Sequence, residues 1–237
     1  MTRWGLFLAG TTVIVVATVA LAALTARSLV VRRKDVDPAR WGDPAAILGV
    51  SRTGLYLNAA ASQGLLLAAL VGLVVLTGVS SADLGVLDRL DAPVAVAAGI
   101  ALGLGLAAGN LGLQRALDAL GIPYDDSLRD LLSPASAAEW AVLLIVVLPV
   151  VAGFEELLFR GALIGALAAG YTVSPWLLAV VSTVLFAAGH GLQGPGGLLA
   201  AGLLGLALAV AFVLSGSLLV VIVAHYVVNA VEFAVHR

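Results

Sequence analysis

The sequence contains no cysteine and has few charged residues for its length of 237. Without cysteine, neither disulfide bonds nor thiolate chemistry is available to the chain. Only 11% of the residues are charged, whereas soluble domains contain about 25%, and 62% are hydrophobic. The apolar runs are long, unlike the short alternating segments of a membrane β-barrel, which excludes that architecture. The composition therefore predicts an all-α, polytopic helical membrane protein.

Lysine is almost absent. Of the twelve basic residues, eleven are arginine and only Lys34 is lysine. Together with abundant Ala, Gly, Val and Leu, this usage is typical of a GC-rich prokaryotic genome. We therefore expect a multi-pass protein of a prokaryotic cell membrane. The net charge of -2 indicates no particular partner. The lipid bilayer is an expected partner, and nucleic acid is not.

Seven apolar stretches are candidates for membrane-spanning helices, which need about 20 residues to cross a ~30 Å hydrocarbon core. They are Trp4–Leu24, Leu55–Val79, Val94–Leu113, Ala137–Ala169, Pro175–Gly189, Leu198–Leu214 and Leu218–Val235. A signal peptide is the competing interpretation of the first, but its positive cluster follows the apolar run, which favours a span. The fourth would be ~50 Å long. We expect it to begin in the interface, to break near Pro149 or Gly153, or to project beyond the bilayer.

Positive charge is concentrated between positions 25 and 54. The basic residues there are Arg27, Arg32, Arg33, Lys34, Arg40 and Arg52. The positive-inside rule places this loop in the cytoplasm, as a topological anchor rather than a nucleic-acid patch. With seven spans, the N-terminus is then outside and the C-terminal His236-Arg237 is cytoplasmic.

A polar segment from 114 to 136 divides the chain. Its Pro123, Asp125 and Pro134 predict a loop with a short surface helix. We place the boundary here, between an N-terminal membrane region, 1–132, with three spans and a C-terminal region, 133–237, with four. In the third span, the spacings Gly99-x3-Gly103 and Gly105-x3-Gly109 indicate close helix packing.

The stretch from Phe154 to Gly161 places two carboxylates and a guanidinium, Glu155, Glu156 and Arg160, within an apolar run. Each such group costs ~2.5–3.5 kcal/mol at the centre of a membrane helix, or roughly 8–10 for three. Insertion of the surrounding apolar residues into the membrane is favourable by only about 4–8 kcal/mol on the same scale. These charges therefore need partners. Glu156 and Arg160 are four residues apart and predict an intrahelical ion pair, whereas Glu155 points elsewhere and is free to face a cavity.

Other polar residues interrupt the later spans. His190 ends the fifth span four residues after Phe186, which we interpret as packing. His225 and Asn229 share one face of the seventh span. Ionisable groups in membrane spans usually face the bundle interior and indicate function. We expect Asn110, Gln114 and Glu232, in contrast, to lie at the membrane interface.

A carboxylate, two histidines and an asparagine on three helices are typical of a site that activates water. The carboxylate and one histidine can take a proton from water, and the other histidine and the asparagine can donate hydrogen bonds to an oxyanion. A zinc site with Glu155, His190 and His225 as ligands is the alternative. Against it, the chain contains no His-Glu-x-x-His motif, and asparagine is a poor zinc ligand.

Three motifs, Glu155-Glu156-x3-Arg160, Phe186-x3-His190 and His225-x3-Asn229, resemble in order those of the CPBP family. These are CAAX-protease and bacteriocin-processing (ABI-like) intramembrane endopeptidases, and the resemblance covers roughly residues 133–237. It implies a catalytic bundle in the C-terminal four helices. Glu155 would activate water with help from His190. The residues His225 and Asn229 would stabilise the oxyanion, while Glu156 and Arg160 would support the site. The family is often labelled as metalloproteases, but the resemblance favours a glutamate-dependent mechanism that requires no cofactor.

The resemblance implies a peptide or protein substrate in or at the membrane. A prenylated CAAX sequence is not the expected substrate, because prokaryotes generally lack such proteins. Two other functions remain open at this point. One is a non-catalytic immunity or binding scaffold. The other is a transporter, against which the lack of a repeated half argues.

Overall fold

The computed structural model describes residues 2–236 except 38–39, 41–42, 87–89 and 126. Within these ranges the chain forms helices and turns, with no strand. Six described helices are long and apolar enough to cross a membrane: Trp4–Leu29, Arg52–Thr77, Ala92–Ala119, Ala137–Tyr171, Gly194–Ser215 and Leu218–Val235. The prediction of an all-α, polytopic membrane protein is thus confirmed.

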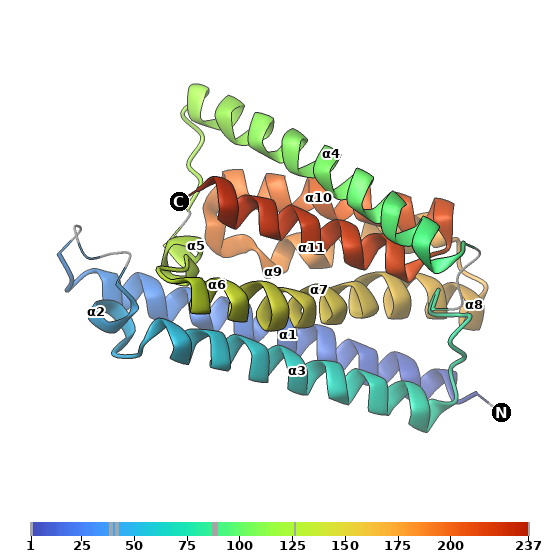
Figure 1. Ribbon diagram of the computed structural model, residues 1–237. Coiled ribbons are helices and arrows are strands. Elements are labelled where there is room, and N and C mark those ends of the chain that lie inside the picture. The colour runs from blue at the N-terminus through green and yellow to red at the C-terminus, as the bar shows by residue number, and fades with distance from the viewer. Residues whose placement is uncertain (1, 38–39, 41–42, 87–89, 126, 237) are drawn as a thin grey trace.

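The fifth predicted span is shorter than the other six helices. It is α9, Pro175–Gly189, a helix of 15 residues that covers ~22 Å at ~1.5 Å per residue. This is less than a ~30 Å hydrocarbon core. In Figure 1, α9 nevertheless runs alongside the longer helices within the bundle.

The remaining helices are named here by their bounds: α1 Trp4–Arg33, α2 Pro44–Leu48, α3 Arg52–Thr77, α4 Ala92–Ala119, α5 Ser127–Leu132, α10 Gly194–Ser215 and α11 Leu218–Val235. The helix α5 is the short helix expected in the polar segment. The third span, α4, continues six residues beyond its predicted end at Leu113 and therefore includes Gln114.

The fourth span is continuous and does not break. It consists of five consecutive segments: α6 Ala137–Val142, η2 Leu143–Val147, α7 Leu148–Glu156, η3 Leu157–Ala166 and α8 Leu167–Tyr171. The segments η2 and η3 are π-helical, with wider turns than an α-helix. The first ends two residues before Pro149, which lacks an N–H and disturbs the α-helical bonding of the preceding turn. The second begins directly after Glu156.

This long helix lies in the middle of the bundle (Figure 1). Helices α1 and α3 lie on one side of it, and α4, α10 and α11 lie on the other. The helix α11 packs against both α4 and α7, and α9 packs against α10 and η3. Charged and polar side chains on the long helix are therefore enclosed by neighbours from both halves of the chain.

Close packing of α4 against α11 depends on two glycines. A Cβ atom on Gly99 would lie 2.7 Å from the carbonyl oxygen of Val220, and one on Gly103 would lie 2.7 Å from that of Ala224. The predicted packing role of this glycine pair is confirmed. It is wrong for Gly105 and Gly109, because nothing lies within 4 Å of a Cβ at either position.

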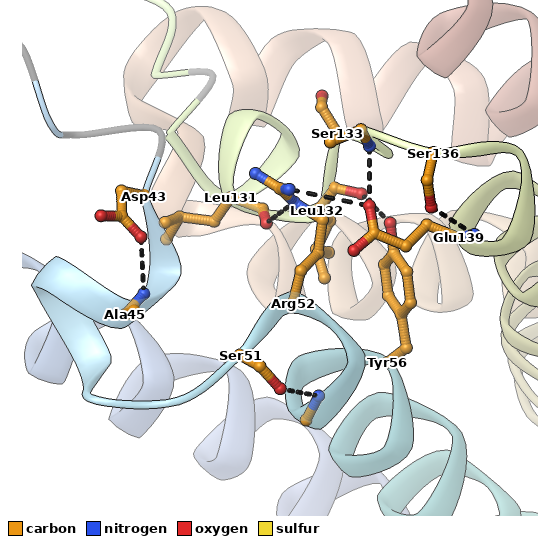
Figure 2. A network of polar contacts seen from close by, with 12 residues as sticks. Asp43, Ala45, Ser51, Arg52, Tyr56, Leu131, Leu132, Ser133, Ser136 and Glu139 are labelled. Atoms are coloured by element: carbon orange, nitrogen blue, oxygen red, sulfur yellow. Dashed lines mark hydrogen bonds and ion pairs between the residues drawn. The ribbon is translucent and has the colours of Figure 1, made fainter.

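A polar network joins the N-terminal helices to the start of the long helix (Figure 2). The Tyr56 hydroxyl donates to the Leu132 carbonyl at 2.8 Å, and Arg52 Nε donates to the Leu131 carbonyl at 3.3 Å. Arg52 Nη1 also lies 3.7 Å from Glu139 Oε2. Ser136 caps α6 through the Glu139 N–H, at 3.2 Å. These contacts fix α3 to α5 and α6.

The two termini lie at opposite ends of the bundle, and the C-terminus lies at the same end as α2 (Figure 1). This arrangement agrees with the prediction that the basic 25–54 loop and the C-terminus share one side of the membrane. Which side faces the cytoplasm stays a prediction. Arg237 lies outside the described residues.

Candidate active site

A cavity of about 140 Å³ lies among α4, α7, α10, α11 and the end of α9. Four of the predicted site residues line it: Glu155, His190, His225 and Asn229. Glu155 lies on α7, His225 and Asn229 lie on α11, and His190 directly follows the last residue of α9. The structure thus brings together side chains that are up to 74 residues apart in the sequence.

The two consecutive glutamates have different surroundings. Glu155 lines the cavity, and its side chain is 13% exposed, whereas the side chain of Glu156 is 0% exposed. Consecutive residues on a helix point about 100° apart, which separates them in this way. Only Glu155 can meet a molecule in the cavity directly.

Glu156 and Arg160 form the ion pair that their spacing predicts. Arg160 Nη1 donates to Glu156 Oε1 at 2.8 Å, and both side chains are fully buried. Arg160 Nη2 also donates to the Gly205 carbonyl on α10 at 2.8 Å. The guanidinium lies over the Phe186 ring, 4.8 Å from its centroid. Arg160 therefore joins the long helix to both α9 and α10.

His225 lies between the two glutamates. Its Nδ1 is 2.6 Å from Glu156 Oε1, and its Nε2 is 3.7 Å from Glu155 Oε2. The first distance is that of a strong, charge-assisted hydrogen bond, and the second is too long for a direct one. The imidazole is 3% exposed, with its free edge in the cavity.

His190 is held by the end of α9. Its Nδ1 donates to the Phe186 carbonyl at 2.9 Å, since a carbonyl oxygen can only accept. In the neutral ring, Nε2 then carries the lone pair and can accept a proton. The Phe186 ring packs against His190, with centroids 4.6 Å apart, and meets His225 edge-on at 6.0 Å. The packing role predicted for Phe186 is thus combined with contact to both histidines.

The three residues that were predicted at the membrane interface form a polar cluster, and two of them, Asn110 and Glu232, line the cavity. Asn110 Nδ2 donates to Glu232 Oε1 at 2.7 Å, and Gln114 Nε2 donates to Glu232 Oε2 at 3.1 Å. Arg129 Nη1 approaches Oε2 at 3.4 Å. Helix α4 packs along α11, which brings Asn110 and Gln114 to the Glu232 carboxylate. Their location at the membrane interface stays a prediction. The spacing of three between Asn229 and Glu232 could have placed both on one face.

Two further cavity residues, Tyr124 and Gln193, were not predicted. They lie where the loop before α5 meets the turn after His190. The backbone of Asp125 donates to the Gln193 carbonyl at 2.9 Å, and that of Gly196 donates to the Pro123 carbonyl at 3.0 Å. A Cβ on Gly196 would lie 2.8 Å from the Pro123 oxygen, so this approach requires glycine. No sequence motif indicates this contact.

The zinc alternative requires three ligands to converge. No group of three or more His, Asp or Glu side chains among the described residues is arranged to hold a metal ion. The structure therefore contains no assembled ligand set for zinc at Glu155, His190 and His225.

One comparison with known proteins finds a match. Residues 137–231 match the family model described as Type II CAAX prenyl endopeptidase Rce1-like. The matched range includes all seven named residues of the three motifs and ends one residue before Glu232. No curated protein and no solved structure matches the chain significantly.

Proposed function

We propose that this chain, whose residues 137–231 match the family model described as Type II CAAX prenyl endopeptidase Rce1-like, is an intramembrane endopeptidase. The water that it uses is activated by Glu155 and His190. The family is a protease family, and the apolar helices make the chain a multi-pass membrane protein. The observation that carries the proposed mechanism is the cavity. It brings together the Glu155 carboxylate, the imidazoles of His190 and His225, and the Asn229 amide.

Glu155 and His190 supply the acceptors for a water proton. As the water oxygen bonds to the peptide carbonyl carbon, the O–H bond breaks and its proton passes to the Glu155 carboxylate. The His190 Nε2 accepts a hydrogen bond from the same water, which orients it. Because the nucleophile is water, no covalent intermediate with the protein forms.

Asn229 and His225 supply the donors for the oxyanion. The carbonyl oxygen gains negative charge as the tetrahedral intermediate forms, and donors fixed in a low-dielectric site stabilise that charge strongly. The Asn229 amide and the protonated imidazole of His225 fill this role. The proton on Glu155 then passes to the leaving nitrogen, and the C–N bond breaks to give a free carboxylate and an amine.

The polar lining of the cavity fits a peptide in or at the membrane. A peptide backbone inside the bilayer needs hydrogen-bond partners, because no bulk water is available there. We propose membrane-associated or secreted peptides as the substrate class. On this proposal the mechanism requires no metal ion.

The test is peptide cleavage by purified protein in lipid nanodiscs, with a library of membrane-associated peptides as substrates. Glu155→Gln keeps the shape of the side chain but removes the base, so we expect cleavage to be lost while peptide binding and thermal stability persist. Asp118→Asn removes an exposed carboxylate on α4 and is the matched control, with parental activity expected. Full cleavage by Glu155→Gln would refute the mechanism. A parent protein that binds peptides but never cleaves them would support a non-catalytic scaffold.

A further inference from the structure

The buried carboxylate of Glu156 contacts two partners through a single oxygen atom. Its Oε1 lies 2.8 Å from Arg160 Nη1 and 2.6 Å from His225 Nδ1. Neither Glu156 nor Arg160 lines the cavity, whereas His225 does. The most direct route from Glu156 to a molecule in the cavity is therefore through His225.

The directions of these two hydrogen bonds follow from the donors available. A guanidinium can only donate, so Glu156 Oε1 accepts from Arg160 and carries negative charge. His225 Nδ1 must then donate to the same oxygen, and Nδ1 therefore holds a proton. In the neutral ring, the lone pair is left on Nε2, which is the nitrogen 3.7 Å from Glu155 Oε2. A second proton on the ring can bind only at Nε2.

We propose that Glu156 is a positioning residue that fixes the tautomer and orientation of His225, so that Nε2 is always the atom presented to the substrate. The inference rests on the proposed function, because it concerns how His225 meets a reacting peptide. In the neutral state, His225 accepts a hydrogen bond from the cavity. It becomes an oxyanion donor only when Nε2 binds a proton.

Arg160 anchors the carboxylate that does the positioning. It bonds to the Gly205 carbonyl on α10 at 2.8 Å, so Glu156 cannot rotate away without breaking a buried ion pair. A Cβ on Gly205 would lie 2.9 Å from the Phe186 ring. The lack of a side chain at Gly205 therefore leaves room for its carbonyl to accept from Arg160 beside that ring. Protonation of His225 also balances the local charge, because the two negative charges of Glu155 and Glu156 are then matched by the positive charges of Arg160 and His225.

The tautomer can be measured without any substrate. In ¹⁵N-histidine-labelled protein, nitrogen-detected NMR separates a protonated ring nitrogen from a bare one. The three histidines are assigned with His190→Gln, His225→Gln and His236→Gln variants. At a pH where the His225 ring is neutral, we expect the proton on Nδ1 and a bare Nε2. A proton on Nε2 instead would overturn the proposal.

Two variants connect the tautomer to turnover. Glu156→Gln retains an oxygen that can accept from both partners, so we expect the Nδ1–H tautomer to persist. The double variant Glu156→Leu/Arg160→Met removes both charges together and leaves no buried charge unpaired. It also removes the acceptor for Nδ1. We expect the Nδ1–H tautomer to be lost. Because the ring is then no longer held in place through Nδ1, we expect kcat to fall about 10²–10⁴-fold, with little change in KM.

The outcomes separate this inference from the proposed function. Retention of the Nδ1–H tautomer in the double variant would overturn the role of Glu156. If the double variant does not fold, the tautomer of the parent protein decides the question alone. If the tautomer behaves as expected but no peptide is cleaved by the parent, Glu156 still positions His225 and only the peptidase assignment fails.

Discussion

Replacing Arg160 with alanine tests the energetics of the buried ion pair. The change leaves the Glu156 carboxylate fully buried without its cation, and breaking a buried pair in this way typically costs about 3–5 kcal/mol of stability. Two contacts adjust this figure. The Gly205 carbonyl loses its donor at 2.8 Å, whereas Glu156 Oε1 keeps the hydrogen bond from His225 Nδ1. We therefore expect a loss toward the lower end of that range.

The assay is reversible unfolding in mixed micelles, followed by tryptophan fluorescence, together with thermal unfolding in a mild detergent. The matched control is the Glu156→Leu/Arg160→Met double variant, which removes both charges and should stay close to the parent in stability. If the free energy of unfolding of Arg160→Ala lies within about 1 kcal/mol of the parent, the reasoning is refuted. A buried carboxylate that has lost its cation should destabilise the protein by more than that. The same result would mean that water reaches Glu156.

Four further predictions concern the site, the cofactor, the packing and the topology. Asn229→Ala should lower kcat about 10²–10³-fold, as expected for the loss of one of two oxyanion donors, and an unchanged kcat would remove it from that role. Peptide cleavage should persist in excess chelator, with no stoichiometric metal by elemental analysis; bound zinc required for turnover would support the metal alternative. Gly103→Ala should lower stability by about 1–3 kcal/mol, because the new Cβ meets a backbone oxygen of α11, whereas Gly105→Ala should change little. Ser51→Cys should react only with reagents that reach the cytoplasm, and labelling from outside would reverse the proposed topology.

Much of the fold could be predicted because a membrane imposes its length scale on the sequence. Apolar runs of about 20 residues located the long helices, and the spacing of four located the Glu156–Arg160 pair. The behaviour of the fourth span could not be predicted. A π-helical segment before Pro149 lets the helix continue through the proline without a break. Sequence spacing alone does not distinguish a π-helical turn from a kink.

The candidate site was predictable only in part, because motifs identify residues but not their partners. The four predicted residues that line the cavity, Glu155, His190, His225 and Asn229, stand out in the sequence as polar side chains on apolar helices. The hydrogen bond from His225 to Glu156 is different, since these residues lie 69 positions apart and meet only through packing. The Glu232 cluster was missed for the same reason. Two of its donors, Asn110 and Gln114, lie on α4, and the glycine contacts with α11 bring that helix close enough.

The contact between residues 123–125 and 193–196 has a consequence for how the protein can be divided. The family match covers 137–231, yet Asn110 and Tyr124 from the preceding segment form part of the cavity wall. A fragment that begins at residue 133 would lack these side chains and the backbone partners of the turn that follows His190. The region that matches the family model therefore does not contain the whole cavity. Transfer of the three motif helices alone to another membrane protein would leave the cavity open on the α4 side.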